Sequence, residues 1–341
     1  MTNPSPYTVV GAGAIGGTLA AHLHTHGVPV QLVDADPEHV AAIRANGLQV
    51  RGPESTLTAN VPVYGLDDAP AQLDRVLLAV KAQATDKAVA WIAPRLSSDG
   101  FVASLQNGLN EATIASHVGM ERTVAAFVDL FADVLEPGVI KDGGSGGMAL
   151  GEYTGGPSDR TRQLAEDLQH WGTPVVTDNV AGFLWSKLGF GAMLVATALA
   201  DRDMSELIDA HRPAMNGLAA EVFDVAAKEG IELEGFDAFD PECYRRGMDP
   251  ARNAAATDAL VAWLATQTKT RSGIWRDIAV RKRPTEVPTQ YLPVIELGKQ
   301  HGIVTPLLTE LVSLIQQLET QSIQMTEEHL TALDTKAAAH A

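Results

Sequence analysis

Cysteine is almost missing from this sequence: Cys243 is the only one in 341 residues. A single thiol excludes any disulfide within the chain, so the fold must hold by packing and suits a reducing compartment. The opening residues, "MTNPSPYTVVGAG", also lack the basic segment that begins a secretory signal peptide. We therefore expect a cytoplasmic protein.

Basic residues are scarce relative to acidic ones. The chain has 25 Lys and Arg against 42 Asp and Glu, for a formal net charge of −17. Such a chain repels phosphate backbones, so we expect no nucleic-acid partner. It is an equally poor match for anionic membrane surfaces, and we assign no metal site.

Long apolar runs are rare as well. Residues 181–200, "AGFLWSKLGFGAMLVATALA", have about the ~20 residues that a bilayer requires. They also contain Lys187 and three glycines, and Asp178 and Asp201 flank them closely. We therefore expect a buried central helix here and no membrane span. Burying an ammonium group costs free energy unless something pairs with it, so Lys187 requires an explanation.

The first half of the chain alternates two patterns. Short β-prone runs occur at 7–10, 28–34, 74–81, 101–108 and 174–178, and helical patterns occur at 11–27, 37–47, 84–96 and 158–171. Alternation of this kind predicts a parallel, doubly wound sheet. Strand-like pieces at 123–152 surround "EPG" and "DGGSGG", which we interpret as hairpin turns.

The second half is helical almost throughout. Helical periodicity recurs at 181–200, 211–229, 251–266, 286–301 and 305–319. A chain of this length usually forms two domains. We place an α/β domain at 1–178 and a helical domain at 179–330. The polar, alanine-rich residues that follow, with 331–341 as a tail, are expected to fray.

A glycine fingerprint follows the first strand. "VVGAGAIGG" places Gly11, Gly13 and Gly16 in the pattern G-x-G-x-x-G, with Ala14 and Ile15 between the last two, and Asp34 ends the second strand. The glycines let backbone N–H groups approach a pyrophosphate at a helix N-terminus. A carboxylate at 34 accepts hydrogen bonds from ribose hydroxyls and repels a 2′-phosphate, which favours NAD over NADP. The alternative is a glycine turn without a ligand. The fold class predicted is thus a Rossmann-type doubly wound N-terminal domain plus an all-α C-terminal domain.

Several short motifs, in order, resemble the ketopantoate reductase (2-dehydropantoate 2-reductase) family. They are the glycine loop, "AVKAQ" around Lys81, "LQNG" around Asn107, "WSKL" around Lys187, "RPTE" ending at Glu286, and "HGIVTP" at 301–306. The resemblance implies a Rossmann domain, a helical domain for substrate binding and dimerisation, and an active site in the cleft between them. We therefore expect a homodimer that takes a small oxo or hydroxy acid.

The resemblance also implies roles for residues. Lys187 would be the general acid and Glu286 would bind substrate or orient the lysine. Ser272 would bind the substrate carboxylate, and Lys81 and Asn107 would lie where nicotinamide and substrate meet. The chemistry agrees, because a cation stabilises the charge that develops on a ketone oxygen and partial burial lowers a lysine pKa. The alternatives are a structural ion pair for Lys187, a first-turn glutamate behind a Thr285 cap, strand-end solvation for Lys81 and a turn asparagine at 107.

The chain departs from the family on the helical face of Lys187 and in the length of one segment, and it also has an unusual basic run. Asparagines usually stand four and eight residues after the lysine, on its helical face, where this chain has Gly191 and Val195. We predict that ketopantoate is not the best substrate and that Gly191 leaves room for a bulkier oxo acid. Residues 232–253 form an insertion, either a substrate lid, an oligomer contact or a surface loop. The basic run 269–283 either attracts an anionic substrate or is a solvated face paired with acidic neighbours.

Together these features predict an NAD-dependent oxidoreductase that interconverts a 2-oxo acid, or a related oxo acid, and its hydroxy acid. One alternative is 2-dehydropantoate 2-reductase itself, which serves pantothenate biosynthesis. An alternative of another class is a regulator that senses dinucleotides without turnover. Such a regulator would need neither Lys187 nor Glu286, which counts against it.

Overall fold

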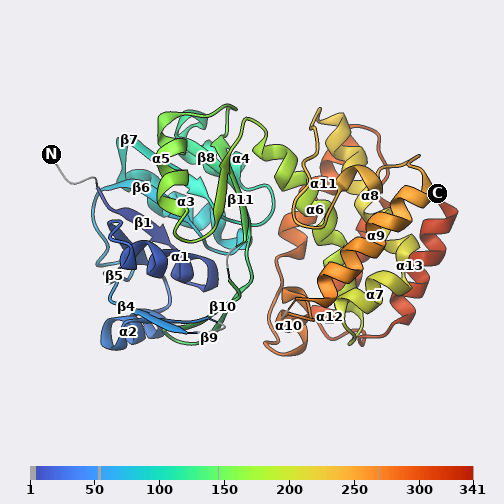
Figure 1. The fold of residues 1–341 in the computed structure, drawn as a ribbon, viewed down its shortest axis with the longest axis horizontal. Helices are drawn as coiled ribbons and strands as arrows, with labels where there is room; N and C mark the ends of the chain where they lie inside the picture. The colour runs from blue at the N-terminus through green and yellow to red at the C-terminus, as the bar shows by residue number, and fades with distance from the viewer. Residues whose placement is uncertain (1–4, 53–54, 145, 268, 341) are drawn as a thin grey trace. The chain divides into compact units, whose positions relative to one another are not determined.

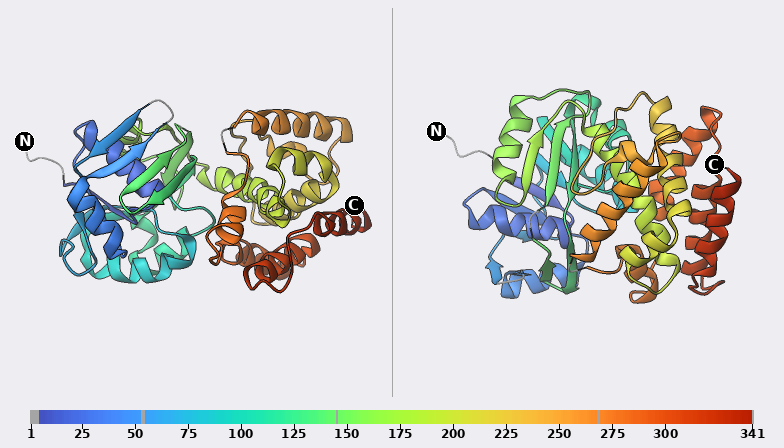
Figure 2. Two further views of the ribbon diagram at one scale, coloured as in Figure 1. Left: turned by 90° about the horizontal axis from the view of Figure 1, so that it is seen from below. Right: turned by 45° about the vertical axis from the view of Figure 1, so that its right-hand side comes forward.

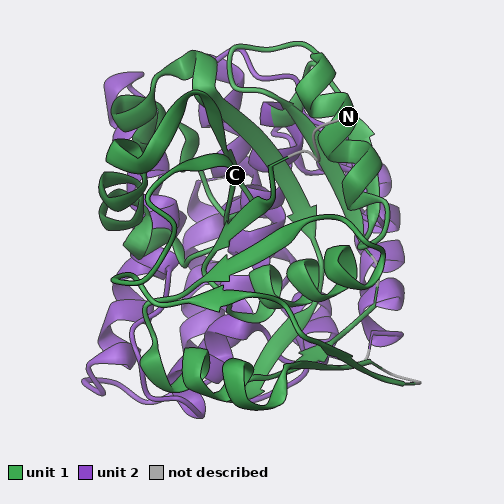
Figure 3. Ribbon diagram, turned by 90° about the vertical axis from the view of Figure 1, so that its left-hand side faces the viewer, with its two compact units in different colours: residues 1–180 green, residues 181–341 purple. Residues whose placement is uncertain are grey.

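The computed structural model describes residues 5–52, 55–144, 146–267 and 269–340. The chain divides into two compact units, Met1–Val180 and Ala181–Ala341 (Figure 3). Unit 1 combines a parallel sheet with helices, and unit 2 is built of helices (Figures 1 and 2). The predicted fold class, a doubly wound α/β part followed by an all-α part, is confirmed.

An eight-stranded sheet forms the centre of unit 1, in the order β12-β11-β8-β7-β6-β1-β2-β5. Its strands are β1 (Tyr7–Val10), β2 (Val30–Val33), β5 (Val63–Tyr64), β6 (Leu73–Leu78), β7 (Leu96–Ser104), β8 (Thr123–Asp129), β11 (Gly147–Glu152) and β12 (Thr173–Val176). β11 and β12 run against the other six. The chain leaves β1 toward β2 on one side and later reaches β6 on the other. The carboxyl end of β1 is therefore a topological switch point, where open α/β sheets bind ligands.

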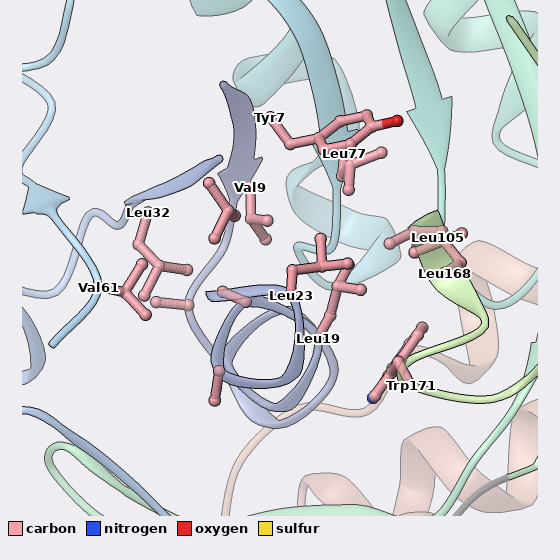
Figure 4. Packing of buried hydrophobic residues seen from close by; sticks show 14 of the residues in the cluster. Tyr7, Val9, Leu19, Leu23, Leu32, Val61, Leu77, Leu105, Leu168 and Trp171 are labelled. Carbon is pink, nitrogen blue, oxygen red and sulfur yellow. The ribbon is translucent and has the colours of Figure 1, made fainter. Parts of the chain in front are cut away.

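Helix α1 packs against this sheet through a dry core. Leu19 and Leu23 lie among Val9 and Leu77 of the strands, with Trp171 beyond them (Figure 4). The helical elements of unit 1 are α1 (Ala14–Thr25), α2 (Pro37–Asn46), η1 (Ala82–Ala84), α3 (Thr85–Ile92), η2 (Ala93–Arg95), α4 (Glu111–Val118), η3 (Met120–Arg122) and α5 (Asp159–Leu168).

A second, four-stranded sheet packs against α1. Its order is β4 (Thr56–Ala59), β3 (Leu48–Arg51), β10 (Val139–Asp142) and β9 (Ala132–Glu136). The "EPG" turn joins β9 to β10 as predicted, with Gly138 at φ 77°. The hairpin predicted at "DGGSGG" is wrong, because β10 belongs to this sheet while β11 belongs to the large one; Ser145, within that turn, lies outside the described residues.

Unit 2 surrounds the apolar helix α6. Its elements are α6 (Val180–Ala196), η4 (Thr197–Leu199), α7 (Met204–Ala210), α8 (Arg212–Lys228), η5 (Pro241–Tyr244), α9 (Pro250–Ala265), α10 (Gly273–Ala279), α11 (Val287–Gln300), α12 (Pro306–Glu319) and α13 (Glu328–Ala339). The stretch Val180–Leu199 is long and apolar enough to cross a membrane, but 72% of its most apolar window is buried in the protein. This agrees with the expected central core helix.

The predicted fraying tail is wrong, because this segment forms helix α13. Leu330 and Leu333 are buried at helical spacing. Asp334 accepts a hydrogen bond from the backbone N–H of Ala214 at 2.9 Å and pairs with His211 at 2.7 Å. The small polar residues around the two leucines concealed an amphipathic helix.

The insertion contributes aromatic side chains to the core of unit 2. The rings of Phe236 and Phe239 pack against Phe190 of α6, and Tyr244 stacks on Phe239 with centroids 4.9 Å apart. The backbone N–H of Glu234 also donates to Ser186 Oγ at 3.1 Å. The surface-loop alternative is therefore wrong for residues 236–244.

Candidate active site

The surroundings of the three fingerprint glycines differ, so each position requires or permits glycine for a different reason. Gly11 has φ 99°, and a Cβ there would lie 2.9 Å from the backbone carbon of Ala79. A Cβ on Gly16 would lie 2.0 Å from the carbonyl oxygen of Gly11. A Cβ on Gly13, in contrast, would meet no heavy atom of the described residues within 4 Å. Gly11 and Gly16 are thus required by the fold, while Gly13 leaves open space at the N-terminus of α1, as a pyrophosphate needs.

Asp34 lies beside this loop at the end of β2. Its Oδ2 accepts the N–H of Ala12 at 2.6 Å and its Oδ1 accepts the N–H of Asp36 at 2.8 Å. Each carboxylate oxygen has a further lone pair, so Asp34 can hold the loop and still accept ribose hydroxyls. The first basic residue beyond it, Arg44, donates to the carbonyl of Val63 and to Asp68.

A buried histidine that sequence analysis missed also holds the loop. The N–H of Gly138 donates to His39 Nδ1 at 3.1 Å, so the proton of the neutral ring is on Nε2. Nε2 in turn donates to the carbonyl oxygen of Ala12 at 2.9 Å. His39 therefore ties the glycine loop to the β9–β10 hairpin. No motif indicated this, because both partners are backbone atoms.

Lys81 and Asn107 follow the adjacent strands β6 and β7. The Nε2 of Gln106 donates to the carbonyl of Val80 at 2.9 Å and to Thr85 Oγ1 at 2.7 Å, which ties the two loops together. Lys81 is half-buried and Asn107 is exposed. The carboxyl edge of the sheet therefore collects all eight predicted cofactor residues: Gly11, Gly13, Ala14, Ile15, Gly16, Asp34, Lys81 and Asn107.

One buried carboxyl lies four residues beyond Asn107. Glu111 begins α4 and is 3% exposed. Burial raises the pKa of its carboxyl to about 7, so a large share of it is protonated near neutral pH. Perturbed groups of this kind are concentrated at functional sites, although the sequence alone did not mark this one.

In unit 2, α6 presents three predicted residues on one face. Lys187, Gly191 and Val195 are four residues apart and therefore lie in line along the helix. Lys187 is half-buried between the buried residues Ser186 and Leu188, and Val195 is 3% exposed. The lysine is thus the one charged residue of α6 in an otherwise apolar and small setting.

The space expected at Gly191 is partly occupied by a tyrosine. A Cβ on Gly191 would lie 2.8 Å from the hydroxyl oxygen of Tyr291, which donates to the carbonyl oxygen of Leu188 at 3.0 Å. The Tyr291 hydroxyl therefore takes up part of the room predicted at Gly191, whose use by a bulkier substrate stays a prediction. Tyr291 comes from α11, a hundred residues further along the chain, so the local sequence could not show it.

Glu286 and Ser272 each precede a helix. Glu286 is half-buried directly before α11, and Thr285 Oγ1 accepts the N–H of Val287 at 3.2 Å, as a cap. Ser272 is buried and caps α10 by accepting the N–H of Trp275 at 3.1 Å. Capping uses an oxygen lone pair, so the Ser272 hydroxyl keeps its proton for donation.

The basic segment 269–283 is partly paired within unit 2. Arg271 binds Asp203, and Arg281 and Arg283 pair with the buried Asp277 at 3.2 and 2.8 Å. These contacts support the alternative of a face paired with acidic neighbours. Across the part of the chain that the structure describes, His, Cys, Asp and Glu side chains form no group of three or more that could hold a metal ion.

Two family models match this chain. The model "Ketopantoate reductase PanE/ApbA" matches residues 7–155, and the model of the ketopantoate reductase PanE/ApbA C terminus matches residues 179–319. Curated relatives match over nearly their full length. The 2-dehydropantoate 2-reductase of Halobacterium salinarum is 28% identical over 314 residues, or 90% of this chain and 96% of that protein. The enzyme of Lactococcus lactis is 26% identical over 318 residues, or 92% and 97%.

Solved structures of two enzymes are similar to this fold. D-mandelate dehydrogenase in a ternary complex with NADH and anilino(oxo)acetate aligns with a TM-score of 0.78 at 25% identity, over 92% of this chain and 98% of that one. A ketopantoate reductase from Ralstonia eutropha aligns with a TM-score of 0.77 at 25% identity, over 92% and 99%. The similarity therefore includes residues of both units.

Proposed function

This chain belongs to the ketopantoate reductase PanE/ApbA family of oxidoreductases, and we propose that it interconverts a small 2-oxo acid and its 2-hydroxy acid with NAD(H). The resemblance inferred from the motifs is thereby confirmed. The observation that carries the proposal is the pairing, in one chain, of an open glycine loop beside Asp34 with Lys187 on the apolar helix α6. The proposal includes the homodimeric, cytoplasmic enzyme expected above.

The glycine loop fits a dinucleotide. The open space at Gly13 accepts the pyrophosphate at the N-terminus of α1, where backbone N–H groups face outward. Asp34 receives the adenosine ribose, and Lys81 and Asn107 belong to the loops at the nicotinamide end. Bound NAD(H) supplies the hydride for reduction or accepts it for oxidation.

Lys187 moves the proton. During reduction it donates to the substrate oxygen, and during oxidation it takes that proton back. Its charge also stabilises the negative oxygen that forms as the carbonyl is reduced. Glu286 binds the substrate or orients the lysine, and the Ser272 hydroxyl donates to the substrate carboxylate.

The α6 face beside Lys187 favours an apolar substrate side chain. Val195 has no polar atom, and the Tyr291 hydroxyl at Gly191 already donates to Leu188. A substrate hydroxyl buried against Val195 would find no partner in that side chain, at a cost of about 1–3 kcal/mol. We therefore propose an apolar 2-oxo acid in preference to ketopantoate. The likeness to D-mandelate dehydrogenase, solved with anilino(oxo)acetate, supports this choice.

A substrate panel tests the proposal. We expect NADH oxidation with phenylglyoxylate or 2-oxoisovalerate, with kcat/KM about 5- to 150-fold above that for ketopantoate, the equivalent of one lost hydrogen bond. A tenfold preference for ketopantoate would overturn the apolar substrate class. NADH binding without turnover of any oxo acid would instead favour the dinucleotide-sensing regulator.

Cofactor choice is a separate prediction. NADH should exceed NADPH by about tenfold or more in kcat/KM, because ~1.4 kcal/mol of repulsion between Asp34 and a 2′-phosphate is enough. Asp34→Asn keeps an oxygen for the Ala12 N–H, loses the acceptor of the Asp36 N–H and removes the charge. It should therefore narrow the ratio of NADH to NADPH activity mainly by improving activity with NADPH. Asp34→Ala should also narrow the ratio of kcat/KM with NADH to that with NADPH, and it should lower the stability of the protein. Equal activity of the parent with both cofactors would contradict the prediction.

A further inference from the structure

A hydrogen bond joins the helix that carries Lys187 to the helix that begins after Glu286. Lys187 lies on α6, and α11 begins directly after Glu286. Tyr291 of α11 is 1% exposed, and its hydroxyl donates to the backbone carbonyl of Leu188, the residue after Lys187, at 3.0 Å. The bond therefore reaches α6 at the turn that bears the lysine.

Gly191 provides the space for that hydroxyl. A Cβ at residue 191 would lie 2.8 Å from the Tyr291 oxygen, and no other described heavy atom beyond the glycine's chain neighbours and its own helix backbone lies within 4 Å of it. Lys187 and Gly191 are one helical turn apart on the same face. The phenol tip thus occupies the stripe of α6 next to the lysine.

This hydrogen bond restricts the rotation of α6 about its axis more specifically than apolar packing does. α6 is apolar or small almost all round, so burial alone favours many rotations about its axis nearly equally. A hydrogen bond to one named carbonyl, with the phenol seated over one glycine, selects a single rotation. Misplacement of a catalytic group by about 1 Å can cost 10²-fold in rate.

We propose that Tyr291 is a positioning residue for the reaction: seated at Gly191, its hydroxyl fixes the rotation of α6 and thereby the place of Lys187 relative to Glu286. This inference rests on the proposed role of Lys187. It also gives Gly191 a function other than substrate contact, since its lack of a side chain admits the tyrosine.

The test uses a double-mutant cycle with Tyr291→Phe, Gly191→Ala and the double variant. Because the alanine Cβ would collide only with the tyrosine oxygen, removing that oxygen makes room for it. Gly189→Ala is the matched control, because Gly189 lies two residues after Lys187 on the same helix. Its Cβ would lie 2.3 Å from the ring of Phe223 on α8. Each variant is assayed with NADH and either phenylglyoxylate or 2-oxoisovalerate across pH, and its thermal unfolding is measured.

We expect Tyr291→Phe to lower kcat about 3- to 10-fold and to move the basic limb of the kcat–pH profile by about half a pH unit, since that limb reports the general acid. Gly191→Ala should lower kcat by more than about tenfold. The double variant should recover to within about twofold of Tyr291→Phe, because the two sites share one contact. Gly189→Ala should lower the unfolding temperature and leave the pH profile unchanged.

Two results would overturn the positioning role alone, provided that Lys187→Ala is impaired. One is a parental kcat and pH profile in both Tyr291→Phe and Gly191→Ala. The other is a shift of the kcat–pH profile in Gly189→Ala as large as that in Gly191→Ala, because both shifts would then reflect general strain in α6. Parental turnover in Lys187→Ala would overturn the proposed function instead, and this inference with it.

Discussion

Replacing Lys187 with alanine is expected to lower kcat by about 10²–10⁴-fold, the usual contribution of a positioned general acid. The Kd for NADH should be unchanged, because the residues proposed to bind the dinucleotide all come from unit 1, whereas Lys187 belongs to unit 2. Alanine is a good helix former, so α6 should persist. Steady-state rates and NADH fluorescence titration measure the two quantities.

Two further variants separate charge from proton transfer. Lys187→Arg keeps a cation but, with a pKa above ~12, holds its proton too tightly to donate it. It should recover little of the lost kcat. Lys228→Ala, at an exposed position at the end of α8, is the control and should retain parental rates. Turnover of Lys187→Ala within a few-fold of the parent would make the lysine structural.

Gly13→Ala is expected to weaken NADH binding, whereas Gly16→Ala is expected to lower the stability of the fold. Gly13→Ala should fold like the parent, because its Cβ would meet no atom of the part of the chain that the structure describes within 4 Å. Its methyl group would stand where the pyrophosphate approaches, so NADH affinity should fall about 5- to 150-fold, as for an overpacked contact of 1–3 kcal/mol.

Gly16→Ala should lose stability first. Its Cβ would lie 2.0 Å from the carbonyl of Gly11, and the backbone must shift to relieve a clash of that size. We expect a loss of about 1–3 kcal/mol or more in the free energy of unfolding. Thermal unfolding and NADH titration of both variants test the pair. Parental NADH affinity in Gly13→Ala would mean that no pyrophosphate lies there.

Local features of the site could be predicted from the sequence. The glycine loop, its strand and Asp34 are close along the chain, and their chemistry follows from their spacing. The small sheet was missed because it joins β3 and β4 to β10 and β9, which lie far along the chain. α13 was missed because two leucines carry its apolar face.

The contacts that hold the site in place join residues that are far apart along the chain. His39 acts through the backbone atoms of Ala12 and Gly138, which no residue pattern records. The sequence shows that residue 191 has no side chain. Only the tertiary structure shows that the Tyr291 hydroxyl of α11 lies beside it. Sequence thus indicated which residue types serve the chemistry, whereas the tertiary contacts decide which space is available to a substrate.

Helix α13 has a consequence for the order in which the chain folds as it is synthesised. The strands and helices of unit 1 are complete by Val180, so its sheet can close while the remaining residues are still being made. Unit 2 has no such advantage, because α8, near its beginning, is covered by α13 at its end. The apolar side chains that meet Leu330 and Leu333 stay exposed until α13 has left the ribosome. We therefore expect the helical unit to expose more apolar surface during synthesis than unit 1 does.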